Sequence, residues 1–169
     1  MKTIYLGMGC FWGAEKKFWQ LPGVVSTEVG YQGGGPEPVD YRTVCTGRTG
    51  HAEVVRVDYD EAVVSTREVL RVFWENHDPT QGDRQGNDVG SQYRSAVFWC
   101  DAEQREVAEQ TRAEFAPVLA AGGMGPITTE IGPAAARPFH RAEEHHQKYL
   151  QKNPNGYDCH GHIGFFLPA

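Results

Sequence analysis

The order of strand-like and helix-like segments is the feature of this sequence that most constrains its fold. Runs of β-branched and apolar side chains, typical of strands, alternate with two segments whose apolar side chains recur at helical spacing. The strands are expected at 3–6, 24–30, 52–59 and 95–100, and the helices at 11–20 and 65–77. This order predicts an α+β two-layer sandwich with a split β-α-β (ferredoxin-like) core, in which helices cover one face of a mixed or antiparallel sheet.

The segments outside this core are less regular. Asp101 is expected to cap a helix that reaches about residue 121, with Pro117 expected to kink or end it. A short strand is expected at 127–131 and a last helix at 141–151, followed by a long C-terminal coil. The chain, 1–169, is thus predicted to be a single domain with 153–169 as a flexible C-terminal tail.

Composition excludes several classes of function. A chain of 169 residues with 40% hydrophobic side chains can bury one core, and its net charge of −6 disfavours nucleic acid and anionic membranes as partners. Its apolar runs are too short for a membrane span or a signal peptide. Four cysteines without a secretion signal leave catalytic, redox or metal roles open, so a cytoplasmic location is expected.

Cys10 stands where the first expected strand ends and the first expected helix begins. Unpaired backbone N–H groups at a helix start stabilise a thiolate, although a free cysteine can equally be a small buried hydrophobe. Two features of the flanks favour function. Gly7 and Gly9 let the backbone approach a ligand, and the adjacent rings of Phe11 and Trp12 cannot both face the core, so one of them is free to line a pocket.

Polar side chains in three other segments are candidates to act with Cys10. Glu53 lies among apolar neighbours that would raise its pKa and make it a general acid, unless it faces solvent on an edge strand. His51 either pairs with Cys10 or fills a turn. Three tyrosines and one aspartate lie in or beside glycine-bearing loops, where they can hydrogen-bond a substrate oxygen or simply pack: Tyr31, Tyr41, Tyr93 and Asp88.

The remaining cysteines and the late histidines point to redox chemistry rather than to a metal. Five of the seven histidines follow residue 139, but no Cys-x-x-Cys or His-Glu-x-x-His spacing is present, so no metal or other cofactor is expected. Cys159 lies in the glycine-bearing tail, which can bring its thiol to Cys10. Cys100 ends an apolar strand and is expected in the core, and nothing in the sequence favours a function for Cys45.

Seven collinear stretches carry a resemblance to a known family. They are 9–13 (Gly-Cys-Phe-Trp-Gly), 30–34, 49–53, 73–79, 86–88, 92–96 and 127–131. Together they make the chain similar, over nearly its whole length, to the peptide-methionine (S)-S-oxide reductases, MsrA. The resemblance implies an enzyme that reduces methionine-S-sulfoxide, free or in proteins, and so repairs oxidative damage.

The same resemblance implies roles for the candidate residues. Cys10 would be the nucleophile, Phe11 and Trp12 the apolar box for the substrate methyl group, and Glu53 the acid near the sulfoxide oxygen. Tyr41, Tyr93 and Asp88 would complete the polar side of the site. Attack by Cys10 would leave a sulfenic acid, and Cys159 would convert it to a Cys10–Cys159 disulfide that thioredoxin reduces.

One departure from the family and two rival functions remain at this stage. Some relatives carry two tail cysteines, whereas this tail holds only Cys159. This difference implies that the Cys10–Cys159 disulfide is recycled directly. The chain is expected to be monomeric. A cysteine hydrolase that uses Cys10 and His51 would need no such thiol. A peptide-binding module would use the aromatic pocket without turnover.

Overall fold

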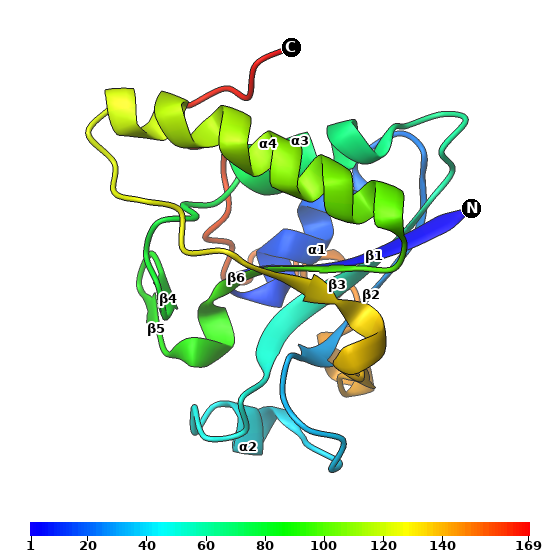
Figure 1. Ribbon diagram of the computed structural model, residues 1–169. Coiled ribbons are helices and arrows are strands. Elements are labelled where there is room, and N and C mark those ends of the chain that lie inside the picture. Colours follow the sequence, from blue (N-terminus) through cyan, green and yellow to red (C-terminus); the bar gives the residue numbers. More distant parts are fainter.

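A six-stranded sheet with helices packed on one face forms the body of the protein, as a computed structural model of residues 1–169 shows (Figure 1). The strand order is β7-β6-β1-β3-β2-β8. The strands are β1 (Lys2–Met8), β2 (Val24–Gln32), β3 (Ala52–Tyr59), β6 (Ser95–Trp99), β7 (Glu130–Pro133) and β8 (His140–Arg141). A separate two-stranded hairpin consists of β4 (Arg84–Gln85) and β5 (Asp88–Val89).

The four central strands have the predicted split β-α-β arrangement. β3 pairs antiparallel with both β1 and β2, so it lies between the two strands that α1 (Phe11–Trp19) connects. β6 pairs antiparallel with the other side of β1 after the chain has passed through α3 (Thr66–Glu75). Only the outer pair, β6 and β7, is parallel. The predicted α+β class with a mixed, mostly antiparallel sheet is confirmed.

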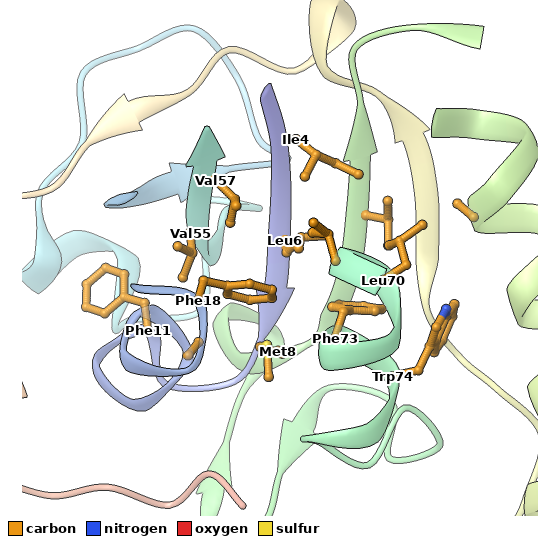
Figure 2. Close-up of a cluster of buried hydrophobic side chains, with 14 of the residues drawn as sticks. Ile4, Leu6, Met8, Phe11, Phe18, Val55, Val57, Leu70, Phe73 and Trp74 are labelled. Atoms are coloured by element: carbon orange, nitrogen blue, oxygen red, sulfur yellow. The ribbon is translucent and has the colours of Figure 1, made fainter. Parts of the chain in front are cut away.

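The main core lies between this sheet and its helices (Figure 2). Alternate side chains of β1 and β3, such as Leu6 and Val55, face Phe18 of α1 and Phe73 of α3, and all four are fully buried. The period of two along the strands meets the period of 3.6 along the helices, and this match drives the two layers together. Ser65 caps α3, since its hydroxyl accepts the backbone N–H of Glu68.

The prediction of one last helix over 141–151 is wrong in the central part of this range. Instead of one helix over 141–151, the chain forms β8, a 3₁₀ turn at Glu144–His146 and a short α5 at Tyr149–Lys152. Lys148 separates the last two with a left-handed backbone, at φ 52°. No sequence pattern predicts this interruption of the helix, because it depends on contacts between Lys148 and a distant helix that are described below.

Three smaller differences have local causes. The strand expected at 127–131 is shifted to β7, because Thr128 donates its backbone N–H to Pro79 instead of to β6. Pro117 does not end α4 (Ala102–Ala121), since its ring lies on the exposed side of the last turns. A short α2 (Tyr41–Val44), capped by Asp40, occurs in a segment with no predicted element.

The C-terminal residues lie on the domain as coil, as predicted. The backbone N–H of Ile163 donates to Glu75 at the end of α3, and Leu167 is buried against the core. No helix of the protein combines the length and the apolar character needed to cross a membrane.

Candidate active site

Cys10 is the N-cap residue of α1 and is 7% exposed. Gly9, with φ 95°, turns the chain from β1 into the helix, and a Cβ there would lie 2.7 Å from the side chain of Gln85. Burial and the nearby charge of Glu53 raise the pKa of the Cys10 thiol above its ordinary range, and the Trp12 amide only partly opposes this rise. The helix start therefore favours the Cys10 thiolate, as predicted, but in the resting protein burial and the charge of Glu53 have the larger effect on the thiol pKa.

Glu53 lies beneath the start of α1 with its carboxyl group fully buried. It follows the alternation of β3 and so faces the helix layer, where Oε1 accepts the backbone N–H of Phe11 at 3.1 Å. Oε2 has no hydrogen-bond partner. Burial raises the pKa of Glu53 to about 8, while the Phe11 amide lowers it and the charge of Asp88 raises it. At neutral pH this carboxyl group is predominantly protonated and can donate a proton.

Tyr41, Tyr93 and Asp88 surround the two reactive groups from three separate segments. Tyr41 begins α2, Tyr93 ends the 3₁₀ turn at Ser91–Tyr93, and Asp88 lies in the β4–β5 hairpin. Burial, and next the charge of Glu53, raise the pKa of both tyrosines, so their hydroxyl groups stay protonated as donors. The structure thus places these predicted residues around one centre.

Phe11 and Trp12 lie in an aromatic cluster that sequence reasoning found only in part. The Trp12 ring stacks on Tyr149, with ring centroids 3.8 Å apart, and its indole N–H donates to His146 Nδ1 at 3.0 Å. His146 also lies 4.5 Å from Tyr41 between ring centroids. The spacing of His146 and Tyr149 was visible in the sequence, but nothing there linked these two residues to Trp12.

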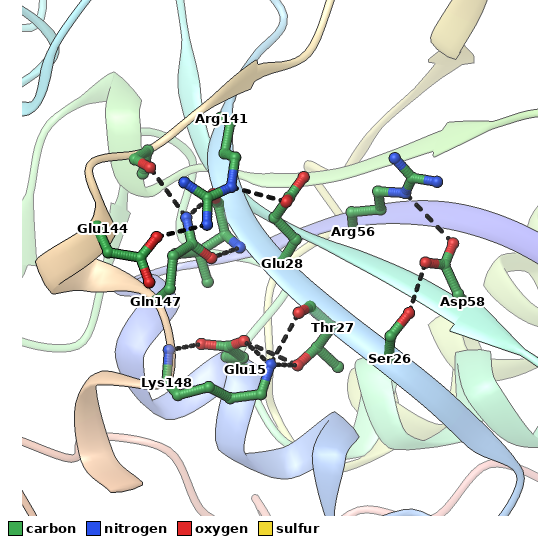
Figure 3. A network of polar contacts seen from close by, with 12 residues as sticks. Glu15, Ser26, Thr27, Glu28, Arg56, Asp58, Arg141, Glu144, Gln147 and Lys148 are labelled. Carbon is green, nitrogen blue, oxygen red and sulfur yellow. Dashed lines mark hydrogen bonds and ion pairs between the residues drawn. The ribbon is translucent and has the colours of Figure 1, made fainter. Parts of the chain in front are cut away.

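A buried polar network holds this aromatic cluster in place (Figure 3). Glu15 of α1 is fully buried, and its carboxylate accepts the backbone N–H of Lys148 at 2.8 Å and the ammonium of Lys148 at 2.9 Å. The same ammonium donates to the carbonyl and hydroxyl oxygens of Thr27. Gln147 pairs its side chain with the backbone of Val29, which extends the sheet edge. These contacts explain the left-handed backbone of Lys148.

The tail brings Cys159 to the site. Its Sγ lies 3.7 Å from Asp88 Oδ2, which also accepts the hydroxyl of Tyr157 at 3.0 Å. His160 Nε2 contacts the carbonyl oxygen of Met8 at 2.5 Å, and the His160 ring lies over Gly13. Met8 and Gly13 bracket Cys10 in the sequence, so the two cysteines lie on the same side of the domain.

The other candidates lie elsewhere. His51 Nδ1 accepts the backbone N–H of Gly34, and its ring packs edge-on against His140 rather than pairing with Cys10. Cys100 is exposed, which contradicts its expected core position, because β6 ends at Trp99 and the chain turns outward into α4. Cys45 is exposed next to Tyr41. No three histidine, cysteine or acidic side chains are grouped as metal ligands.

Comparison with known proteins agrees with this arrangement. The family model for peptide methionine sulfoxide reductase matches residues 2–166. The peptide methionine sulfoxide reductase MsrA of Salinispora arenicola is 57% identical over 170 residues, covering 99% of this chain and 76% of that protein. Among solved structures, methionine sulfoxide reductase A of Corynebacterium diphtheriae superposes with a TM-score of 0.89 at 49% identity, covering 99% of this chain and 83% of that one.

Mxr1 from Saccharomyces cerevisiae in reduced form has a TM-score of 0.84 and 37% identity, and the match covers 99% of this chain and 92% of that one. Mxr1 in complex with Trx2 matches at a TM-score of 0.60 and 24% identity, over 95% of this chain and 88% of that one. A matching family model, relatives above 55% identity and the same fold over almost the whole chain leave one conclusion. This chain belongs to the peptide methionine sulfoxide reductase family, the MsrA enzymes.

Proposed function

We propose that this reductase acts through Cys10 as nucleophile and Glu53 as general acid on methionine-S-sulfoxide, free or in proteins. The observation that carries the proposal is a buried, half-satisfied carboxyl group with a pKa near 8 beside a buried thiol. A sulfoxide oxygen is a poor leaving group until it receives a proton, and Glu53 supplies that proton. Protonated Glu53 also places no negative charge beside Cys10, which makes the thiolate less costly to form.

The first step balances in atoms and electrons. Cys10 thiolate attacks the sulfoxide sulfur and forms a sulfur–sulfur bond, while the oxygen takes the Glu53 proton and leaves as hydroxide when the sulfur–oxygen bond breaks. Hydroxide then bonds to Cys10 Sγ, the sulfur–sulfur bond breaks, and methionine leaves with its electron pair. The products are methionine and a sulfenic acid on Cys10, so the substrate sulfur gains the two electrons that the cysteine sulfur loses. Tyr41, Tyr93 and Asp88 form the polar side of the site, where the two tyrosine hydroxyl groups donate hydrogen bonds that stabilise the developing negative charge on the oxygen.

The aromatic side of the site gives the chirality. Phe11 and Trp12 hold the substrate methyl group, Glu53 holds the oxygen, and Cys10 meets the sulfur, so three fixed points accept a single epimer. We assign the S epimer, in line with the family resemblance. Similar rates on purified S and R methionine sulfoxide would contradict this three-point arrangement.

The second half of the cycle uses Cys159. We propose that it condenses with the Cys10 sulfenic acid to form a disulfide, and that thioredoxin reduces this disulfide by thiol exchange. The support is the position of Cys159 beside Asp88, together with the fact that Mxr1 has been solved in complex with Trx2. We further propose a monomer in the cytoplasm, a single catalytic domain with a tail that moves between steps.

A single-turnover experiment separates the two halves. The Cys10→Ser variant is expected to release no methionine. The Cys159→Ser variant is expected to release about one methionine per enzyme and then to stall with thioredoxin, whereas dithiothreitol, which reaches the sulfenic acid directly, restores turnover. Normal thioredoxin-driven turnover by Cys159→Ser would remove Cys159 from the mechanism, and the exposed Cys100→Ser variant is the matched control.

A further inference from the structure

His160 lies between two groups that together define its protonation. Its Nε2 contacts the backbone carbonyl oxygen of Met8, which can only accept a hydrogen bond, so Nε2 carries the ring proton. Nδ1 is then an unprotonated acceptor, and its one hydrogen-bond partner is the Cys159 thiol, at 3.7 Å. The backbone of β1 therefore sets the tautomer, and the free lone pair of the ring faces the sulfur of the tail cysteine.

We propose that His160 is the general base that takes the proton from Cys159 when this thiol attacks the Cys10 sulfenic acid. The inference rests on the proposed recycling role of Cys159. It makes His160 a further catalytic residue, because its Nδ1 touches a reacting atom. It also gives a function to a histidine whose position in the sequence suggested only a weak metal ligand.

The thiol needs such a base. Burial raises the pKa of Cys159, the Tyr157 hydroxyl lowers it, and the charge of Asp88 raises it, and the net change is upward. Asp88 Oδ2 is the other acceptor near this thiol, but it already accepts the Tyr157 hydroxyl.

His160 is in the form that the step requires. Its pKa is lowered, mainly by burial and also by Lys17, while the Met8 carbonyl and the carboxylates of Asp158 and Asp88 oppose the shift. His77 also lies near enough for the two imidazoles to disfavour each other's charged forms. The ring is thus neutral at physiological pH and has an acceptor nitrogen available.

The step balances without any further reactant. A bond forms between Cys159 Sγ and Cys10 Sγ, and the sulfur–oxygen bond of the sulfenic acid breaks. The Cys159 proton passes to His160 Nδ1, and the imidazolium then gives that proton to the departing hydroxide, which leaves as water, so the site returns to its starting charge. The thiol is oxidised and the sulfenic acid is reduced, so the two electrons are exchanged within the protein.

The contact between His160 and Met8 also explains why His160 already lies near Cys10 when Cys159 reacts. Met8 is two residues before Cys10, and a Cβ on Gly13, three residues after Cys10, would collide with the His160 ring. The ring is thereby held against both ends of the turn that carries the nucleophile. The contact between His160 and Met8 thus holds the tail on the domain and also keeps His160 in position to act as a base.

The test is His160→Gln, whose amide can still donate to Met8 but cannot act as a base. Methionine release in a single turnover is expected to match the wild-type rate, whereas formation of the Cys10–Cys159 disulfide slows roughly 10²-fold at neutral pH. As the pH rises toward the pKa of Cys159 the variant is expected to approach the wild-type rate, because the thiol then ionises without help. His162→Gln, in the same tail, is the control and is expected to behave as wild type.

The outcomes are distinct. Slowing by the same factor at every pH, or no slowing at neutral pH, would show that His160 is only an anchor. Absence of a Cys10–Cys159 linkage in peptide maps of the oxidised wild type would instead refute the recycling role of Cys159 itself.

Discussion

At the scale of single residues, Glu53, the proposed general acid, shows how a buried carboxyl group can oppose stability. Its carboxyl group is buried, Oε2 lacks a partner, and its pKa of about 8 replaces an ordinary 4.5. Between these two pH values the native state binds a proton that the unfolded chain has lost. The free energy of unfolding must therefore fall as the pH rises through this window, by at most about 1.4 kcal/mol per pH unit from this group.

Glu53→Gln is expected to move activity and stability in opposite directions. The reductive step should slow roughly 10²–10⁴-fold, the range for losing a general acid. The neutral amide removes the titration, so the variant should be more stable than the wild type at pH 9 and similar to it near pH 4. Urea unfolding at several pH values measures this, with the exposed Glu109→Gln as control. Parallel stability curves for Glu53→Gln and the wild type would mean that Glu53 is ionised throughout.

At the scale of elements, the pairing of Glu15 with Lys148 joins helix α1 to the segment that holds the aromatic cluster. One carboxylate satisfies the N–H and the ammonium of Lys148 and the hydroxyl of Thr27. The chain accepts a left-handed backbone at Lys148, and Tyr149 follows directly and stacks on Trp12. The polar network therefore positions the ring of Trp12, which is proposed to bind the substrate methyl group, from outside the site.

Glu15→Ala is expected to destabilise the protein by about 1–3 kcal/mol, because the Lys148 N–H and the Thr27 hydroxyl lose their acceptor, while the half-exposed Lys148 ammonium keeps the Thr27 oxygens. It should also raise KM for the sulfoxide more than it lowers kcat, since Tyr149 loses its support for Trp12. Arg141→Ala is the matched control: it breaks two exposed ion pairs, to Glu28 and Glu144, and should cost about 0–1 kcal/mol. Urea unfolding and steady-state kinetics check both. Equal losses in the two variants would contradict the difference between buried and exposed pairs.

At the scale of the whole molecule, the docking of the tail depends on the absence of a side chain at Gly13. A Cβ there would lie 2.6 Å from Asp158 Oδ1 and would collide with His160. The same tail is held by an ion pair between Asp158 and Lys16 at 3.5 Å. The tail and helix α1, which are distant in sequence, therefore form one continuous surface only because Gly13 has no side chain.

Gly13→Ala is expected to leave the fold intact, since alanine favours a helix more than glycine does by about 1 kcal/mol. The tail can no longer seat, so thioredoxin-driven turnover should fall at least about tenfold while dithiothreitol-driven turnover persists. Gly161→Ala is the control, because a Cβ there meets nothing within 4 Å. Steady-state rates with the two reductants check the expectation, and an equal loss with both would indicate damage to the methionine-releasing step instead.

The sequence by itself determined the layer structure and the chemistry-bearing residues. The periodicities of 3–6, 52–59 and 65–77 depend on side chains a few residues apart, so the predicted bounds of β1, β3 and α3 are correct to within about a turn. Cys10 and Glu53 were likewise visible, because each is an unusual residue type for its local setting, whereas Asp88 was a candidate through its glycine-bearing loop and the family resemblance.

Only the tertiary structure decided how these residues act. The left-handed Lys148, the hydrogen bond that holds Glu53 Oε1 against the Phe11 amide and the tautomer of His160 each depend on a partner more than 40 residues away in the chain. Cys100 shows the same limit, since its exposure depends on where the chain turns after β6. The local sequence pattern encodes which face of a helix or strand is buried. A pKa, a hydrogen-bond partner or the docking position of the tail depends instead on which residues of other elements lie nearby.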